Sequence, residues 1–361
     1  MTETPDTTEN SGSQADAAKT AQPEAVSSAK KPKRFLKWLL VSFMLICVLG
    51  AGALGGTFYY AKDQYERAGP ASQDLTVQFK RGTSLIAIAR KLENAGAITD
   101  ARIFRFGIQL QKGQGALKAG EYNIPAAASM AEIFALLKSG KSILHKVTIP
   151  EGITVQEAMA VIQANPILTG DLPAMPPEGS LLPETYLFER GMTRTELVTQ
   201  MRTALTAELD KQWAARAENL PLNSPQEALI LASIVEKETG LAAERPQVAS
   251  VFINRLRRPM RLQSDPTIIY GITLGKTTLG RGLRRSEIDR KTPYNTYQID
   301  GLPPTPIALV GPDAIHAVLN PPTSKFYYFV ADGTGGHVFA TSLREHEKNV
   351  RNWRKIERQR K

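Results

Sequence analysis

A Glu-Lys-Glu sequence at residues 236–238 holds the side chains of this chain that are best suited to acid–base chemistry. It ends an apolar run that starts after Ser224, which predicts a helix of about four turns. At about 100° per residue, Glu238 lies within roughly 20° of Leu231, whereas Glu236 points nearly the opposite way. We therefore predict that Glu238, and not Glu236, shares the line of large apolar residues.

This position suits Glu238 to the role of general acid. Burial and the negative end of the helix dipole both disfavour a carboxylate, so both raise its pKa. A carboxyl group that stays protonated near neutral pH can donate a proton to a leaving group. The alternative is that residues 236–238 are only a solvated helix end.

Two polar segments downstream carry residue types that bind sugars. They offer amides, hydroxyls and flat aromatic rings, and we predict seven of their residues as substrate-binding. These are Gln263, Ser264, Asp265, Tyr294, Asn295, Thr296 and Tyr297. The alternative is that Ser-Asp-Pro and Tyr-Asn-Thr simply form turns.

Several other kinds of site are not predicted. The histidines share no metal-ligand spacing, so we predict no metal and no cofactor, although His337 beside a glycine-rich turn could line a cleft. They are His145, His316, His337 and His346. Residues 333–336 lack the Lys-Ser/Thr of a phosphate loop, and Ser233 and Ser264 lie near no recognisable His base. The single cysteine, Cys47, allows no disulfide within the chain.

Six motifs, in order over roughly residues 145–345, resemble the endolytic murein transglycosylase family, also called MltG or YceG-like. They are Ala232–Thr239, Val248–Leu256, Met260–Thr267, Tyr294–Tyr297, Gly301–Pro304 and Phe329–Gly333. The resemblance implies a lytic transglycosylase that cleaves peptidoglycan glycan strands and so ends glycan elongation. It also implies that Glu238 is the catalytic acid/base, that the muramyl C6 hydroxyl attacks to leave a 1,6-anhydro end, and that peptidoglycan synthases are partners.

Two other functions remain open at this point. A hydrolytic muramidase would need a second carboxylate, for which Asp265, Asp300 and Glu236 are candidates. A glycan-binding scaffold that recruits synthases would need no catalysis at all. The identity of the product end separates the first from a transglycosylase, and a working Glu238 separates the second.

The elements that must position these residues indicate an α+β fold. A strand, a glycine turn, a Ser/Thr N-cap and an amphipathic helix follow one another at 77–92 and again at 147–162, with a third partial copy at 120–137. These units resemble LysM-like modules that bind N-acetylglucosamine polymers, or they only space the catalytic part from the membrane. Ser224 and Glu227 predict a capping box for the helix that ends near Glu238.

An N-terminal anchor is also predicted. Residues 38–61 carry no charge and follow a Lys/Arg cluster, which predicts one transmembrane helix with a cytoplasmic N-terminus and an extracytoplasmic catalytic part at the bacterial inner membrane. The predicted segments are a disordered cytoplasmic tail (1–29), this helix (38–61), a polar stalk (62–74), a LysM-like module (75–145), a catalytic domain (146–345) that begins with a second LysM-like repeat, and a basic tail (346–361). The net charge of +10 is concentrated near the ends, without the aromatic-interleaved groove that binds nucleic acid.

Overall fold

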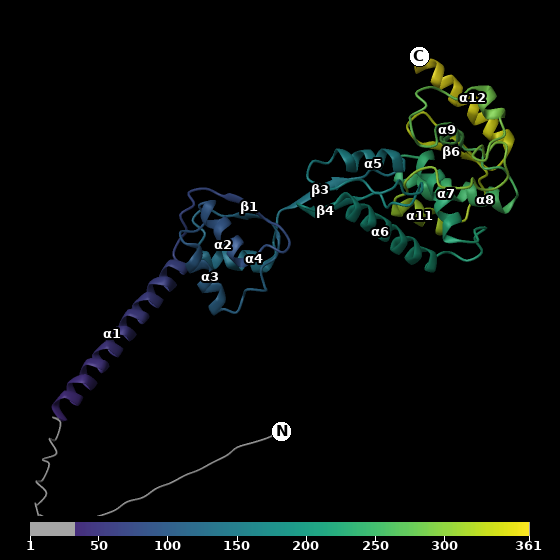
Figure 1. The fold of residues 1–361 in the computed structure, drawn as a ribbon. Helices are drawn as coiled ribbons and strands as arrows, with labels where there is room; N and C mark the ends of the chain where they lie inside the picture. Colours follow the sequence, from purple (N-terminus) through teal and green to yellow (C-terminus); the bar gives the residue numbers. More distant parts are fainter. Residues whose placement is uncertain (1–32, 361) are drawn as a thin grey trace, which may run out of the picture. The chain divides into compact units, whose positions relative to one another are not determined.

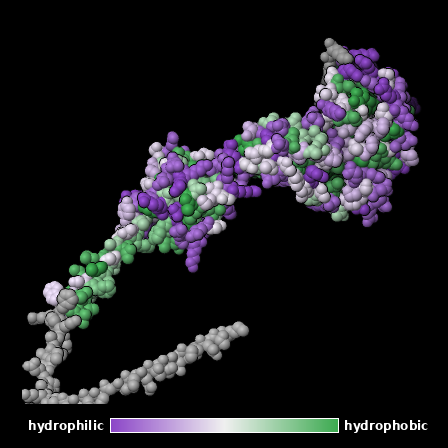
Figure 2. Space-filling model, viewed as in Figure 1, coloured by the Kyte–Doolittle hydropathy of each residue, from purple (hydrophilic) through white to green (hydrophobic). Residues whose placement is uncertain are grey.

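The computed structural model describes residues 33–360, and the chain divides into two units, residues 1–63 and 64–361 (Figure 1). Helix α1 (Lys33–Glu66) contains the predicted span of residues 38–61. It is the helix of the described chain that is long and apolar enough to cross a membrane. The large apolar side chains between Leu36 and Tyr60 are exposed, and they form a hydrophobic surface in the space-filling view (Figure 2). The predicted disordered tail, residues 1–29, lies outside the described residues.

The second unit begins with a module of two strands and three helices (Figure 1). Strands β1 (Leu75–Phe79) and β2 (Gly120–Ile124) form an antiparallel pair. Helices α2 (Leu85–Asn94) and α3 (Ala101–Leu110) lie between them in the chain, and α4 (Met130–Ser139) follows. Their apolar faces share one core, which includes Phe79, Leu92, Phe104, Tyr122, Ile133 and Leu137.

The chain just before β1 also belongs to this module, so the prediction of a polar stalk at residues 62–74 is wrong. The ring of Tyr65 is buried in the module core. The backbone N–H of Gly69 donates to the carbonyl of Ala127 at 3.0 Å, and the N–H of Ala127 donates to that of Ala71 at 2.8 Å. One buried aromatic ring and backbone hydrogen bonds attach this segment to the module. Neither can be recognised from the polar composition of the segment.

The three predicted strand–turn–helix segments are present. Ser84, Ser129 and Thr154 each accept a hydrogen bond from a backbone N–H in the first turn of the helix that follows. The strand of the segment at 120–137, β2, pairs with β1 of the first copy, so these two segments belong to one module. Local caps and periodicity identify such segments, but they do not identify the partner of a strand.

A second two-stranded unit follows the first module. Strands β3 (Leu144–Thr148) and β4 (Thr185–Glu189) are antiparallel, with α5 (Val155–Ala164) between them and α6 (Arg194–Ala214) after them. The boundary predicted between residues 145 and 146 therefore falls inside β3. The core of this unit includes Ile149, Met159, Ile162, Leu181, Leu197 and Met201.

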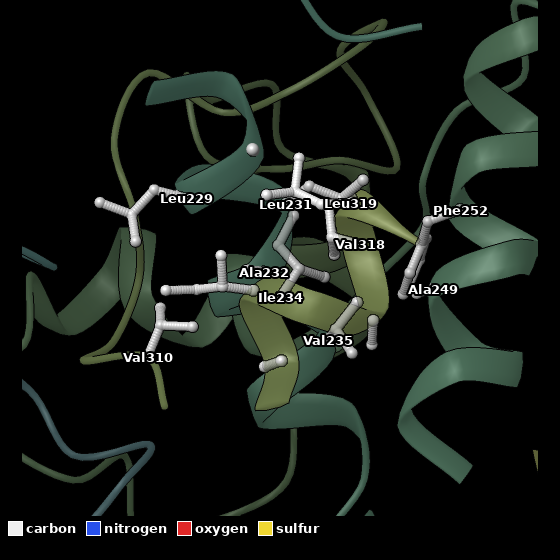
Figure 3. Close-up of a cluster of buried hydrophobic side chains, with 14 of the residues drawn as sticks. Leu229, Leu231, Ala232, Ile234, Val235, Ala249, Phe252, Val310, Val318 and Leu319 are labelled. Carbon is white, nitrogen blue, oxygen red and sulfur yellow. The ribbon is translucent and has the colours of Figure 1, made fainter. Parts of the chain in front are cut away.

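The largest core surrounds a central helix, α7 (Pro225–Glu238). Helices α8 (Arg245–Arg257) and α11 (Pro312–Leu319) pack against it. Figure 3 shows that side chains from all three helices meet in this core. The labelled members are Leu229, Leu231, Ala232, Ile234, Val235, Ala249, Phe252, Val310, Val318 and Leu319. The end of α7, where Glu238 lies, is thus held by its surroundings.

Short elements complete the C-terminal part. They are η1 (Ala242–Glu244), α9 (Asp265–Thr273), α10 (Arg285–Asp289), β5 (Tyr328–Ala331), β6 (His337–Ala340) and α12 (Leu343–Arg360). Strands β5 and β6 are antiparallel partners and form a hairpin. The predicted basic tail, residues 346–361, starts inside α12, which packs on this hairpin. The fold is α+β, as predicted.

Candidate active site

Helix α7 is built by local signals and then buried on most of its surface. The hydroxyl of Ser224 accepts the N–H of Glu227 at 3.2 Å, so the N-cap is confirmed. The Glu227 carboxylate instead accepts the N–H of Asn223 at 2.7 Å, and the predicted capping box is incomplete. All residues from Ala228 to Glu236 are buried. A single apolar side was therefore the wrong description of this helix.

The burial of the two glutamates at the end of α7 is the reverse of what we predicted. Glu236 is buried, whereas Glu238 is only half-buried. Glu236 is accommodated because Arg245 binds it, with Nη2 3.0 Å from Oε1, and because the N–H of Gly311 donates to Oε2 at 3.2 Å. Burial nevertheless raises the pKa of Glu236, and the nearby Glu151 raises it further. The hydrogen bonds of the Glu236 carboxylate are therefore made to groups of the protein itself.

The carboxyl group of Glu238 has one close hydrogen bond, from the hydroxyl of Ser264 to Oε1 at 2.5 Å. Burial raises the pKa of Glu238 to about 7, and the negative charge of Asp265 acts in the same direction. The Ser264 hydrogen bond and the positive charges of His337 and Arg255 act against this rise. At neutral pH the group is thus poised between its acid and its base form.

Ser264 is fixed by its neighbours rather than by its own helix. It is the N-cap residue of α9, but its hydroxyl makes no cap bond because it binds Glu238. Its backbone N–H donates to Oγ1 of Thr296 at 2.9 Å. Oγ1 of Thr296 lies 2.9 Å from that of Thr267, whose own hydroxyl donates to the Ser264 carbonyl. Two buried threonines therefore hold the serine toward Glu238.

Asp265 and Tyr297 form a second polar pair beside Glu238. The Tyr297 hydroxyl donates to Oδ1 of Asp265 at 2.7 Å. Burial raises the pKa of Tyr297, and the Asp265 carboxylate raises it further. Asp265 is exposed and Tyr297 half-buried, so both remain accessible to a ligand.

Gln263 is exposed, at the edge of this site. Its backbone has φ +55°, a left-handed conformation that non-glycine residues rarely adopt. Its side-chain oxygen accepts from Nη1 of Arg255 at 3.2 Å, and its N–H donates to the carbonyl of Thr296. The buried Arg255 also donates to the carbonyls of Arg261 and Leu262, so one guanidinium shapes the whole turn before Ser264.

The other predicted residues build the loop. The side-chain amide of Asn295 donates to three backbone carbonyls, those of Glu287, Ile288 and Arg290. Its oxygen accepts the N–H of Tyr297 at 3.0 Å. Both ends of this buried amide are therefore occupied by protein.

Tyr294 is half-buried and packs against the core, and its side-chain contacts are with residues other than Glu238. Its ring packs edge-on against Tyr270 with centroids 5.1 Å apart, and its hydroxyl lies 2.8 Å from Oγ1 of Thr305. The structure thus brings together Gln263, Ser264, Asp265, Thr296 and Tyr297 around Glu238, but not Tyr294. Asn295 supports this group only through the backbone.

Sequence reasoning missed two charged residues near the end of α7, Glu244 and Arg245. Glu244 binds His337, with Oε2 2.8 Å from Nδ1. Its neighbour Arg245 binds both Glu236 and Glu151. Glu244 and Arg245 open helix α8 and carry no sequence signal, because their partners lie far away in the chain. The glycine-rich turn before His337 was the available clue.

The arrangement can carry out proton transfer. One carboxyl group with a near-neutral pKa can give a proton to a leaving oxygen and later take one back. In the described part of the chain, no three His, Cys, Asp or Glu side chains cluster in a way that could hold a metal ion. The chemistry available here is that of acids, bases and hydrogen-bond donors.

This chain is similar to known proteins in sequence and in structure. The model of the YceG-like family matches residues 77–352. The endolytic murein transglycosylase of Streptococcus pneumoniae serotype 2 (strain D39 / NCTC 7466) is 31% identical over 365 aligned positions, which cover 87% of this chain and 65% of that protein. The Bacillus subtilis (strain 168) protein of the same name is 28% identical, covering 82% of this chain and 89% of its own. A crystal structure of a putative YceG-like protein from Listeria monocytogenes is similar over 77% of this chain and 99% of its own, with 29% identity and a TM-score of 0.46. The aligned part of this chain spans just under two thirds of the streptococcal relative.

Proposed function

This chain belongs to the YceG-like family, and we propose that it is an endolytic peptidoglycan lytic transglycosylase with Glu238 as its acid/base. The relatives from Streptococcus pneumoniae and Bacillus subtilis carry the name endolytic murein transglycosylase. The observation that carries the proposal is the half-buried carboxyl of Glu238, bound by Ser264 at 2.5 Å, with its pKa raised to about 7 by burial.

The proposed reaction begins with the carboxyl group of Glu238 in its protonated form. The protonated form of Glu238 donates its proton to the glycosidic oxygen as the bond from C1 of N-acetylmuramic acid breaks. The C6 hydroxyl of the same sugar then bonds to C1, and its proton leaves for a base of the site. The product is a 1,6-anhydro end, and no water is consumed. A pKa near 7 keeps a fraction of Glu238 protonated at neutral pH, as the first proton transfer requires.

Exposed polar groups around Glu238 are the proposed glycan contacts. Gln263, Asp265 and Tyr297 are accessible and combine an amide, a carboxylate and a hydroxyl-bearing ring. Ser264 is buried and already donates to Glu238, so we assign it the positioning of that carboxyl. The buried Thr296 in turn holds Ser264 in place, because its hydroxyl oxygen accepts the backbone N–H of Ser264.

The two alternative functions predict different products. In a hydrolytic muramidase, Asp265 would be the second carboxylate, since its charge acts on Glu238. Its hydrogen bond from Tyr297 holds it in place beside the site. A scaffold that only binds glycan has no use for a carboxyl group tuned to a near-neutral pKa, which is the reason for preferring an enzyme.

The test is to incubate the full chain in detergent with uncrosslinked glycan strands and to read the product masses. We expect fragments lighter by one water than hydrolysis products, with internal cleavage, and none from Glu238→Gln. Asp313→Asn serves as the matched carboxylate control, because Asp313 is exposed and lies on α11. Hydrated ends would indicate a muramidase, and glycan retention without cleavage would indicate a scaffold.

The setting of this activity is part of the proposal. We propose that α1 anchors the chain in the inner membrane with a cytoplasmic N-terminus, as the Lys/Arg cluster before residue 38 favours. The first module, in which two helices lie between two antiparallel strands, and the β3–β4 unit are proposed as LysM-like glycan-binding modules. Peptidoglycan synthases, which make the substrate, are the proposed partners.

A further inference from the structure

His337, the first residue of β6, is held by both oxygens of one carboxylate. Its ring Nδ1 lies 2.8 Å from Oε2 of Glu244, and its backbone N–H donates to Oε1 at 2.8 Å. The ring also meets Phe329 edge-on, with centroids 5.3 Å apart. These contacts fix the position and the plane of the imidazole. A carboxylate at Nδ1 also favours the tautomer whose Nε2 is free to accept a proton.

The glycine-rich turn before His337 is shaped for this contact. The Asp332 carboxylate accepts hydrogen bonds from the N–H and hydroxyl of Thr334 and from the N–H of Gly336. A Cβ atom on Gly336 would lie 2.6 Å from Oε1 of Glu244. A larger residue here would have to displace this carboxylate, so glycine favours the close approach in which His337 binds it.

The pair lies next to the catalytic helix end. Oε2 of Glu244 also accepts from the hydroxyl of Thr239, the residue after Glu238, at 3.4 Å. His337 is also near enough to Glu238 for a positive charge on its ring to lower the pKa of that carboxyl. About 15% of the His337 side chain is exposed, and in the described chain its Nε2 has no hydrogen-bond partner. A held imidazole with one open nitrogen, beside a carboxyl group, is the arrangement of a second acid–base residue.

We propose that His337, oriented by Glu244, is the base that accepts the proton of the attacking sugar hydroxyl. This inference rests on the proposed transglycosylase function. As the C1 bond to the leaving oxygen breaks, Glu238 gives that oxygen its proton. The C6 oxygen bonds to C1, and its proton passes to Nε2 of His337. The enzyme is left with a carboxylate and an imidazolium, and one proton transfer from His337 to Glu238 restores both.

The competing role for His337 is structural, through its hydrogen bond to Glu244, and two variants separate the roles. His337→Asn keeps a side-chain donor for Glu244 but has no counterpart of Nε2. His337→Ala removes both and leaves space that added imidazole can enter. His346→Ala is the matched control, because His346 is a half-buried histidine stacked on Tyr328 of the same hairpin.

The experiment measures glycan cleavage by the full chain, with glycan retention and thermal stability measured in parallel. We expect His337→Asn and His337→Ala to lower kcat about 100-fold with retention unchanged, imidazole to restore part of the rate to His337→Ala, and His346→Ala to match the wild type. A fully active His337→Asn, or a His337→Ala that imidazole does not accelerate, overturns the base role. Hydrated product ends from the wild type would overturn the proposed function as well, whereas anhydro ends with an unaffected His337 series would overturn this inference alone.

Discussion

The carboxyl group of Glu238 experiences opposing influences, and one of them can be removed alone. The group must be protonated to act as an acid, so kcat/KM should fall as pH rises through about 7. The hydrogen bond from Ser264 lowers this pKa. We therefore expect Ser264→Ala to shift the decline to higher pH, as measured by a pH profile of glycan cleavage.

A control serine shows whether that shift is specific. Ser250 is as buried as Ser264, but its hydroxyl binds Gln247 and Ser324 instead of the site. Ser250→Ala should leave the pH profile in place. A profile of Ser264→Ala that does not move, or that moves to lower pH, would mean that the short hydrogen bond does not act on the catalytic proton.

The same carboxyl should also cost stability at high pH. Its pKa is raised from 4.5 to about 7 on folding, so the folded state holds the proton more tightly than the unfolded state. The stabilisation of the folded state by this proton is fully present below pH 4.5 and is lost as pH rises through 7. Glu238→Gln cannot ionise, so its Tm should match that of the wild type near pH 4 and exceed it near pH 8. Equal Tm values at pH 8 would contradict a raised pKa.

At the scale of residues, the sequence singles out Glu238 as a candidate but gives no sign of how Glu236 is buried. Glu238 could be chosen because position along a helix and the family motifs are local properties. The burial of Glu236 could not be predicted, since it depends on Arg245 and on the N–H of Gly311, which fold against it from elsewhere. Asn295 has a sugar-binding residue type, but its amide is used by loop carbonyls.

Among the elements, α7 depends on one arginine. Nη2 of Arg245 lies 2.9 Å from Glu151 and 3.0 Å from Glu236. Arg245→Met would leave the buried Glu236 without its countercharge, and we expect the free energy of unfolding to fall by about 3–5 kcal/mol. Adding Glu236→Gln should recover part of this loss, because it removes the unpaired carboxylate. Chemical denaturation measures both.

An exposed pair provides the comparison. Arg285 binds Asp289 within α10, with both side chains largely in solvent. Arg285→Met should change the free energy of unfolding by less than about 1 kcal/mol. Similar losses at the two arginines would show that the buried network does not secure α7.

Elements were predictable where their signals are short-range. Ser84, Ser129 and Thr154 mark helix starts by side-chain caps that need only the next turn. The pairing of β1 with β2 joins residues about 45 positions apart, as in Leu75 with Ile124 and Phe79 with Gly120, and no local pattern encodes it. Helix α12 was missed as an element because its composition is so strongly basic.

For the whole molecule, the apolar helix should decide where the protein resides. Removal of residues 1–63 takes away most of the segment Leu36–Glu66, and with it the exposed apolar surface of α1. We expect the shortened chain to leave the membrane fraction and still cleave isolated glycan strands. Carbonate extraction followed by an activity assay measures this. A chain that stays membrane-bound after the deletion would show that another surface holds it there.

The ion pair between Arg245 and Glu151 also limits which segments of this chain could be exchanged for those of a relative. Glu151 follows β3, Lys237 next to the catalytic residue donates to the carbonyl of Gly152 at 2.9 Å, and Gly311 has no room for a side chain beside Glu151. In a hybrid protein that changes from one parent sequence to the other between β4 and α7, Glu151 would come from one parent and Arg245 and Gly311 from the other. A hybrid joined between α4 and β3 keeps all of these residues from one parent. We therefore expect the β3–β4 unit and the helices around α7 to be exchangeable only together. The first module is also tied to the β3–β4 unit, because Glu121 binds His145 and Arg190.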